Sequence, residues 1–200
     1  MLKIVKRVAN FLVRPAYEWS VIESERGSFV RVLAVYLAPL ALIAPIAYAI
    51  SLLIGGNDAL RSFPDAGAHL RFALAFAAAG FVMQILGVLV TAGVVYLVLP
   101  LYDGARNYAT AARLVAYAAT PVWLAGIVLV APLQKFPLLA MVILIALMHA
   151  SYIFYLGLHQ IAKVRLREAA ECAAVVVFAS LVLSTALGYA AGSLGLLPQM

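Results

Sequence analysis

Residues 72–102 read FALAFAAAGFVMQILGVLVTAGVVYLVLPLY, a run of 31 residues without one charged side chain. The hydrocarbon layer of a membrane is about 30 Å thick and a helix rises about 1.5 Å per residue, so roughly 20 apolar residues cross it. An unpaired backbone amide in lipid costs several kcal/mol, which excludes an irregular chain at that depth. The stretch therefore predicts a membrane-spanning helix.

Four other stretches share this property, and all 22 charged side chains (14 Lys and Arg, 8 Asp and Glu) lie outside the five. The four are 32–57, 114–134, 136–162 and 172–200, with 26, 21, 27 and 29 residues. Each is long enough to cross a bilayer. The sequence predicts an all-α polytopic membrane protein with a short N-terminal amphipathic interfacial helix and five transmembrane helices, at about 32–54, 74–100, 114–132, 138–161 and 173–197.

The composition excludes an ordinary soluble domain. Hydrophobic residues make up 66% of the chain and the mean hydropathy is +1.07, whereas soluble domains are about half apolar. The net charge of +6 fits basic loops that face anionic lipid. No basic and aromatic groove of the kind that binds nucleic acid is present. We expect a cytoplasmic interfacial segment, 1–31, followed by one membrane domain, 32–200, with the lipid bilayer and no nucleic acid as partner.

The distribution of basic residues predicts the topology. Six Lys and Arg precede the first span. Counted with these six and with the C-terminal segment, alternate segments outside the spans hold eleven on one side and three on the other. Cytoplasmic loops carry the excess of Lys and Arg. We therefore expect a multi-pass protein of the bacterial cytoplasmic (inner) membrane, with a cytoplasmic N-terminus and an extracytoplasmic C-terminus.

Residues 2–14 predict an amphipathic helix. At 100° per residue its polar side chains fall within about a 100° arc; they are Lys3, Lys6, Arg7, Asn10 and Arg14. Apolar residues, Phe11 among them, occupy the opposite face. Such a helix lies in the headgroup plane, so we predict that Lys3, Lys6, Arg7 and Arg14 bind the membrane surface. The alternative is a helix packed on the cytoplasmic end of the bundle.

The stretch 15–31 begins with Pro15, which ends the preceding helix. Its carboxylates, Glu18, Glu23 and Glu25, either pair with nearby arginines or contact a partner. Trp19 suits the membrane–water interface. No nucleophile or metal ligand accompanies the carboxylates, so acid–base catalysis is disfavoured here.

Two predicted spans carry small and polar residues on one face. These residues are Gly80, Gln84, Gly87 and Thr91 in one span, and Ser184, Gly188 and Gly192 in the other. Helices in lipid associate through close backbone approach, so we interpret both faces as helix-packing surfaces, within the monomer or between copies. Contact of Gln84 with a transported polar solute is the alternative. Interior prolines at 39, 45 and 121 predict bends.

The stretch 136–162 and its C-terminal flank carry a polar seam: His149, Tyr152, His159 and Lys163 fall within about an 80° arc. An ionisable group at membrane depth marks function by default. However, His159 and Lys163 lie near the predicted cytoplasmic end, where long side chains reach water. We predict a structural seam, with a proton or solute path as the alternative.

The sequence contains no HExxH, P-loop or dinucleotide-binding motif. Two histidines ten positions apart are too few for a metal site. We therefore predict no enzyme activity and no cofactor. Cys172 is the single cysteine and cannot form an internal disulfide. We interpret it as a small apolar side chain, with palmitoylation as the alternative.

Several short motifs resemble the bacterial members of the Yip (Ypt-interacting protein) domain family. They begin with Arg14-Pro15, Glu18-Trp19, Ile22, Glu25, Tyr36, Pro39 and Pro45, and continue with 104–108 (GARNY), 116–118 (AYA), 120–126 (TPVWLAG) and 155–158 (YLGL). The resemblance covers nearly the whole chain, and 120–126 is its most specific motif.

The resemblance implies a five-span membrane protein with a cytoplasmic N-terminus and without catalytic residues. Eukaryotic relatives act in membrane traffic and bind prenylated small GTPases through their N-terminal region. This chain lacks their long N-terminal domain and their Asp-Leu-Tyr-Gly-Pro signature, so GTPase binding is not carried over. We expect a non-enzymatic scaffold that associates with lipid, with other membrane proteins or with itself; the alternative is a small transporter or channel component that uses the polar seams.

Overall fold

The computed structural model describes residues 2–25, 28–54, 65–131 and 136–193. Within these ranges the chain forms helices and short connections, without strands. The elements in chain order are α1 (Leu2–Val13), α2 (Pro15–Ser24), α3 (Phe29–Arg31), η1 (Val32–Leu37), α4 (Ala38–Ala41), α5 (Ile43–Ile54), α6 (Ala66–Val98), η3 (Leu99–Tyr102), α7 (Tyr108–Ala118), α8 (Thr120–Ala125), η4 (Gly126–Val130), α9 (Leu138–Gln160) and α10 (Leu166–Ser193).

Three helical segments of the described chain are long and apolar enough to cross a membrane: Phe29–Ile54, Ala66–Tyr102 and Leu138–Gln160. A fourth candidate is the pair Tyr108–Ala118 and Thr120–Val130, which is bent by 40°. The structure therefore supports an all-helical protein with three to four candidate spans. The fifth predicted span falls on α10 and is taken up below.

Prolines explain the irregular first segment. A proline lacks an N–H donor, and its ring collides with the carbonyl four residues earlier. The π-helical segment η1 precedes Pro39. A turn at Leu42, three residues before Pro45, separates α4 from α5. The first segment thus stays helical past both prolines, because the backbone departs from α-helical geometry just before each of them.

Helix α6 begins earlier than predicted. We expected a span from about residue 74, but the helix starts at Ala66. The carboxylate of Asp65 accepts a hydrogen bond from the Ala68 amide at 2.7 Å. Asp65 therefore acts as a helix N-cap, because it satisfies an amide that has no partner within the first turn.

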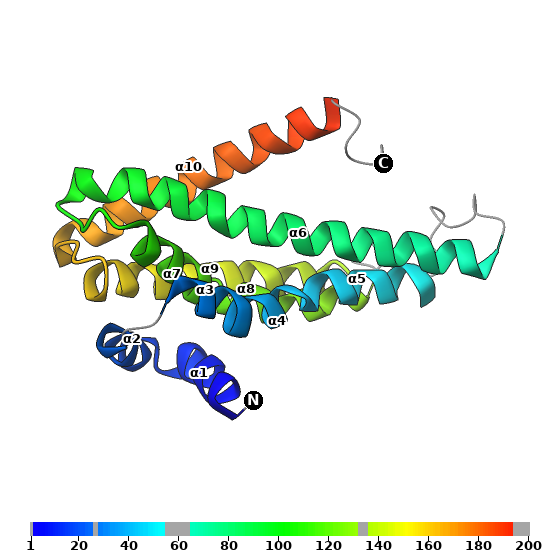
Figure 1. The fold of residues 1–200 in the computed structure, drawn as a ribbon, viewed down its shortest axis with the longest axis horizontal. Helices are drawn as coiled ribbons and strands as arrows, with labels where there is room; N and C mark the ends of the chain where they lie inside the picture. Colours follow the sequence, from blue (N-terminus) through cyan, green and yellow to red (C-terminus); the bar gives the residue numbers. More distant parts are fainter. Residues whose placement is uncertain (1, 26–27, 55–64, 132–135, 194–200) are drawn as a thin grey trace.

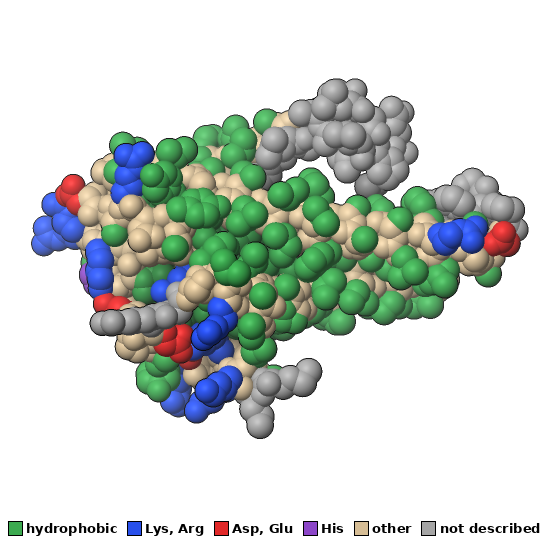
Figure 2. Space-filling view, viewed as in Figure 1, with side chains coloured by type: hydrophobic (Ala, Val, Ile, Leu, Met, Phe, Trp, Pro, Cys, Tyr) green, Lys and Arg blue, Asp and Glu red, His purple; other side chains and the backbone are tan. Residues whose placement is uncertain are grey.

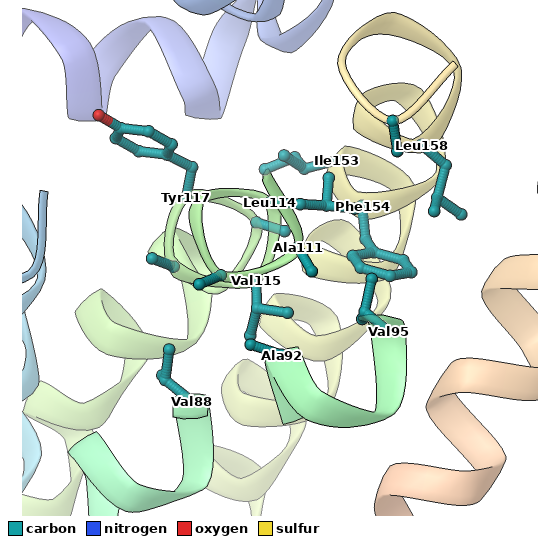
Figure 3. Packing of buried hydrophobic residues seen from close by; sticks show 14 of the residues in the cluster. Val88, Ala92, Val95, Ala111, Leu114, Val115, Tyr117, Ile153, Phe154 and Leu158 are labelled. Atoms are coloured by element: carbon teal, nitrogen blue, oxygen red, sulfur yellow. The ribbon is translucent and has the colours of Figure 1, made fainter. Parts of the chain in front are cut away.

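The core lies where α7 passes between α6 and α9. Figure 3 shows α7 with Leu114 and Tyr117 directed to different neighbours, while Val95 of α6 and Phe154 of α9 pack beside it. Every residue from Leu114 to Ala118 is buried. Burial on all sides explains why α7 has mostly small side chains, since neighbouring backbones must approach closely.

Apolar side chains also cover the outside of the bundle. Figure 2 shows hydrophobic atoms along its length and charged atoms gathered at its ends. Leu86 of α6 is 47% exposed, Met148 of α9 is 67% exposed and Phe178 of α10 is 69% exposed. In Figure 1, α10 diverges from the other helices as it proceeds from its first turns. An outward apolar surface of this extent is the surface that lipid covers.

Candidate functional site: the docked N-terminal helices

Helices α1 and α2 pack against one end of the bundle (Figure 1). Helix α1 ends at Val13, and Pro15 is the first residue of α2. Proline suits this position because the first helical amide has no acceptor within the helix. The break folds α2 back beside α1, so that both helices contact the bundle.

Arg7 connects α1 to both α2 and α7. Its Nε donates to Glu18 Oε1 of α2 at 2.9 Å, and its Nη2 donates to Glu25 Oε1 at 2.5 Å. Its Nη1 donates to the hydroxyl of Tyr117 in α7 at 2.9 Å. Asn10 completes the cluster by donating to the second oxygen of Glu18 at 2.7 Å. Glu18 and Glu25 therefore pair with an arginine, which was one of the two roles expected for the carboxylates of 15–31.

Electrostatics favour the charged form of Arg7. Glu18 is 3% exposed, so its carboxylate depends on Arg7 and Asn10 for the hydrogen bonds that water would otherwise supply. Burial opposes the charge on the guanidinium of Arg7, but its hydrogen bond to Glu25 and its contacts with Tyr117 outweigh that effect. The pKa of Arg7 consequently lies above its ordinary value.

Aromatic rings close the surface between α1, α2 and the bundle. Phe11 stacks on Tyr117 with centroids 5.4 Å apart and meets Trp19 edge-on at 5.1 Å. Tyr36 contacts the same Tyr117 ring at 4.7 Å. Phe11 is fully buried, so α1 packs on the end of the bundle through part of its apolar face. That arrangement is the alternative weighed for this helix in the sequence.

Trp19 is fully buried, so the prediction that it lies at the membrane–water interface is wrong. Its indole N–H donates to the carbonyl of Ile153 in α9 at 2.9 Å. A Cβ placed on Gly157 would lie 2.6 Å from the Trp19 ring and 2.4 Å from the Leu114 side chain. Gly157 is therefore the site where the absence of a side chain admits the indole.

The motif Thr120-Pro121 connects the same cluster to the first span. Pro121 has no N–H to offer to the carbonyl of Tyr117, and the Thr120 hydroxyl donates to that carbonyl at 2.5 Å. The hydroxyl of Tyr36 lies 2.7 Å from Thr120 Oγ1 and is the donor there, because the one proton of Thr120 is already used. The bend between α7 and α8 thus holds Tyr36 and Tyr117 together.

A second contact ties α2 to the end of α9. Glu23 accepts hydrogen bonds from Gln160 Nε2 at 2.5 Å and from Lys163 Nζ. The hydrogen bond from Lys163, and to a smaller extent that from Gln160, lowers the pKa of the Glu23 carboxyl. Arg113 of α7 donates to the carbonyl of Ile22 at 3.0 Å, which completes the attachment of α2.

The predicted membrane-surface residues separate into two groups. Lys3, Lys6 and Arg14 are exposed, whereas Arg7 is engaged by Glu18, Glu25 and Tyr117. Beside them on α1, apolar Val5, Leu12 and Val13 are 66%, 39% and 76% exposed. Binding of these residues to a membrane surface remains a prediction.

The predicted packing residues of α6 differ in their surroundings. A Cβ on Gly80 would lie 3.5 Å from Pro45 of α5, whereas a Cβ on Gly87 would meet nothing within 4 Å. Gln84 and Thr91 are partly buried. Gly80 therefore faces a neighbouring helix, and Gly87 faces outward. The surroundings of Ser184, Gly188 and Gly192 lie outside the described residues, although α10 runs through these positions.

Gly126 is a second position where two helical segments approach closely, and sequence reasoning missed it as a packing residue. A Cβ there would lie 2.5 Å from Ala44 Cβ. Tyr117, the residue at which the docked helices converge, was missed as well. The signal for both lay in the motifs 116–118 and 120–126, which were noted for their resemblance and not for a structural role.

The predicted polar seam is not one continuous hydrogen-bonded path in the described residues. The rings of His149 and Tyr152 lie 6.2 Å apart, and Tyr152 is 51% exposed. The Nε2 atom of His149 is buried and has no hydrogen-bond partner in the described part of the chain. His159 instead lies 3.0 Å, through Nδ1, from the carbonyl of Val164.

Chemistry at other side chains is restricted. Among residues 2–25, 28–54, 65–131 and 136–193, no group of three or more His, Cys, Asp or Glu side chains is placed to hold a metal ion. Cys172 is fully buried, which agrees with its interpretation as a small apolar side chain and leaves its thiol inaccessible to a lipid donor.

Comparison with known protein families gives a match over most of the chain. A family model described as the Yip1 domain matches residues 9–189. The comparisons with curated proteins and with solved structures give no match. The matched region includes α2, the motif 120–126 and Gly157, and thus most of the docking contacts described above.

Proposed function

We propose, because this chain belongs to the Yip1 domain family, that it is a membrane-embedded scaffold without enzymatic activity. Its docked N-terminal helices would serve as the surface that associates with lipid or with another membrane protein. The observation that carries this proposal is the exposed group on α1 and at its junction with α2: three unpaired cations, Lys3, Lys6 and Arg14, beside exposed apolar side chains. No carboxylate in the described part of the chain pairs with these cations.

The topology proposed for this scaffold has five spans in the bacterial inner membrane. Helix α10 runs from Leu166 to Ser193 and carries no charge after Glu171. At about 1.5 Å per residue, its uncharged part is long enough to cross the hydrocarbon layer. With α10 as the fifth span, the basic excess supports a cytoplasmic N-terminus and an extracytoplasmic C-terminus.

Fusions to the C-terminus test this topology. Alkaline phosphatase is active only outside the cytoplasm, and green fluorescent protein folds efficiently only inside it. We expect an active phosphatase and a dark fluorescent protein for fusions after residue 200, and the reverse after Arg106. A fluorescent C-terminal fusion would instead support four spans.

An environment-sensitive fluorophore tests the scaffold surface. The fluorophore is attached to a cysteine introduced by Val13→Cys in a Cys172→Ser background. The Val13 side chain is 76% exposed in the native chain. We expect a blue-shifted emission in vesicles of phosphatidylglycerol and a loss of that shift after reversal of Lys3, Lys6 and Arg14 to Glu. Reversal of Arg167, which is also exposed, is the control and should leave the emission unchanged.

His149 favours a second candidate, a small transporter. A buried imidazole nitrogen without a partner, in a helix at membrane depth, suits a proton or solute path. The two candidates predict opposite results. A scaffold keeps its associations in His149→Ala, whereas a transporter loses solute flux in reconstituted vesicles while its helical content is retained. Flux that vanished in this variant would contradict the scaffold.

A further inference from the structure

A pocket of about 420 Å³ opens between α1 and the first turns of the first span. Three cationic side chains and one carboxylate line it, namely Lys3, Arg7, Arg31 and Glu25. Figure 2 shows that Lys and Arg side chains gather with Asp and Glu at this end of the molecule. Its charged lining therefore has a positive excess, and an anion is the ligand that it would take.

Two of these cations are available to a ligand. All three nitrogens of the Arg7 guanidinium already donate to Glu18, Glu25 and Tyr117, so Arg7 has no free donor nitrogen to offer and its single charge is shared between two carboxylates. Lys3 and Arg31 are both exposed, and in the described part of the chain neither has an ion-pair partner. Ser28, which also lines the pocket, adds a hydroxyl donor.

The other half of the pocket is apolar. Ile4 of α1 and Val32 and Val35 of η1 line it, and Val35 is 53% exposed. Arg31 is the last charged residue before the uncharged stretch 32–57. Arg31 therefore lies at the level where the first span leaves the lipid, while Val35, four residues further along the helix, lies about one turn deeper. A free phosphate ion would use only the charged half.

We propose that this pocket binds the headgroup phosphate of one anionic glycerophospholipid, with Lys3 and Arg31 as its ligands. Ser28 donates a further hydrogen bond, and Ile4, Val32 and Val35 contact the glycerol and the first acyl carbons. Arg31 suits this role because its planar guanidinium binds two phosphate oxygens at once. The inference rests on the proposed function, since the membrane placement of the first span positions the headgroup at Arg31.

The same geometry disfavours a zwitterionic lipid. A choline group carries a positive charge that would meet the unneutralised Lys3 and Arg31, and Glu25 already pairs with Arg7. A phosphatidylglycerol headgroup brings no such charge. A preference for phosphatidylglycerol over phosphatidylcholine therefore indicates binding in the pocket. Lipid that binds the apolar outer surface of the bundle gives no such preference.

Native mass spectrometry of the full chain in detergent tests the pocket, with equimolar dioleoyl phosphatidylglycerol and phosphatidylcholine as probes. We expect the first bound lipid to be phosphatidylglycerol. Because each cation near a lipid phosphate contributes roughly a fivefold preference, Lys3→Gln or Arg31→Gln alone should lower the preference about fivefold. The double variant should lower it about 30-fold, and Lys3→Arg, which keeps the charge, should retain most of it.

The double variant Arg71→Gln with Arg167→Gln is the matched control. It removes the same charge at exposed positions that neither line the pocket nor belong to the exposed cations of the N-terminal helices, so its preference should stay within about twofold of the native value. An equal loss in both double variants would overturn the pocket but leave the scaffold proposal standing. Absence of any preference, together with an unshifted fluorophore at position 13, would overturn both.

A soluble competitor distinguishes the two sources of phosphate. We expect glycerol 3-phosphate at the same concentration as the lipid to leave bound phosphatidylglycerol unchanged, because it lacks the acyl carbons that Val32 and Val35 contact. Displacement at equal concentration would identify a site for a free phosphate and would overturn the lipid assignment.

Discussion

Arg7 Nη1 lies 2.9 Å from the hydroxyl oxygen of Tyr117, across 110 positions of sequence. This bond, together with the ring of Tyr117 lying 5.5 Å from the guanidinium carbon, attaches the first helix to α7. Because Arg7 also binds Glu18 and Glu25, the loss of this one side chain affects α1, α2 and α7 together.

Arg7→Ala should release α1 and α2 from the bundle. The buried carboxylate of Glu18 would lose its ion pair, and removing one partner of a buried pair costs about 3–5 kcal/mol. We expect about 2 kcal/mol here, since the Arg7 side chain is 20% exposed and water replaces part of the interaction. Faster amide hydrogen exchange of residues 2–24, with the exchange rate in α6 unchanged, would show that α1 and α2 are released. Lys6→Ala should not change either rate.

Gly157→Ala should displace the indole of Trp19. The new methyl group would lie 2.6 Å from the ring, and overpacking of a filled core costs about 1–3 kcal/mol. The measurement is tryptophan emission in a Trp123→Phe background, which should move to longer wavelength as the indole meets water. The matched control is Gly87→Ala on α6, where a Cβ meets nothing within 4 Å and stability should not fall. Equal effects of the two substitutions would contradict the seating of Trp19 on Gly157.

Thr120→Val should destabilise the bundle although the two side chains have nearly the same shape. The hydroxyl of Tyr36 would lose its acceptor, and the carbonyl of Tyr117 would lose a donor. A buried polar group without a partner costs about 1–3 kcal/mol. Thermal unfolding in detergent measures the loss, and Thr120→Ser should restore most of the midpoint because it keeps the hydroxyl.

Acid should loosen the contact between α2 and the end of α9. Hydrogen bonds from Lys163 and Gln160 lower the pKa of Glu23 below its ordinary value of 4.5. A carboxyl with a lowered folded-state pKa contributes stability that is complete above its unfolded pKa and is lost as pH falls through the folded value. The contact should therefore be constant from pH 7 to about pH 5 and weaken below about pH 4.5.

Spin labels at Ser20 and Arg167, both exposed, report this contact as a distance distribution. We expect a narrow distribution at neutral pH that broadens in acid. Glu23→Gln should show one distribution at both pH values, because its side chain does not titrate. Acid broadening of equal size in that variant would assign the effect to another group.

The sequence predicted only part of the docking site. Amphipathic periodicity placed Lys3, Lys6, Arg7 and Arg14 on one face of α1, and three of the four are exposed. The same periodicity cannot distinguish Arg7 from its neighbours, because a helical angle says nothing of which carboxylate or tyrosine another helix brings close. Trp19 was misplaced for the same reason: an indole fits an interface or a core equally well until its hydrogen-bond acceptor is known.

The membrane character of the chain followed from the sequence alone. A long uncharged stretch such as 72–102 satisfies its backbone hydrogen bonds within one helix, so its fate depends on its own composition and length and not on neighbours. The docking site required the tertiary structure. Its contacts join Arg7 to Tyr117 and Trp19 to Ile153, residues 110 and 134 positions apart, and only the packing of helices around α7 decides which side chains meet.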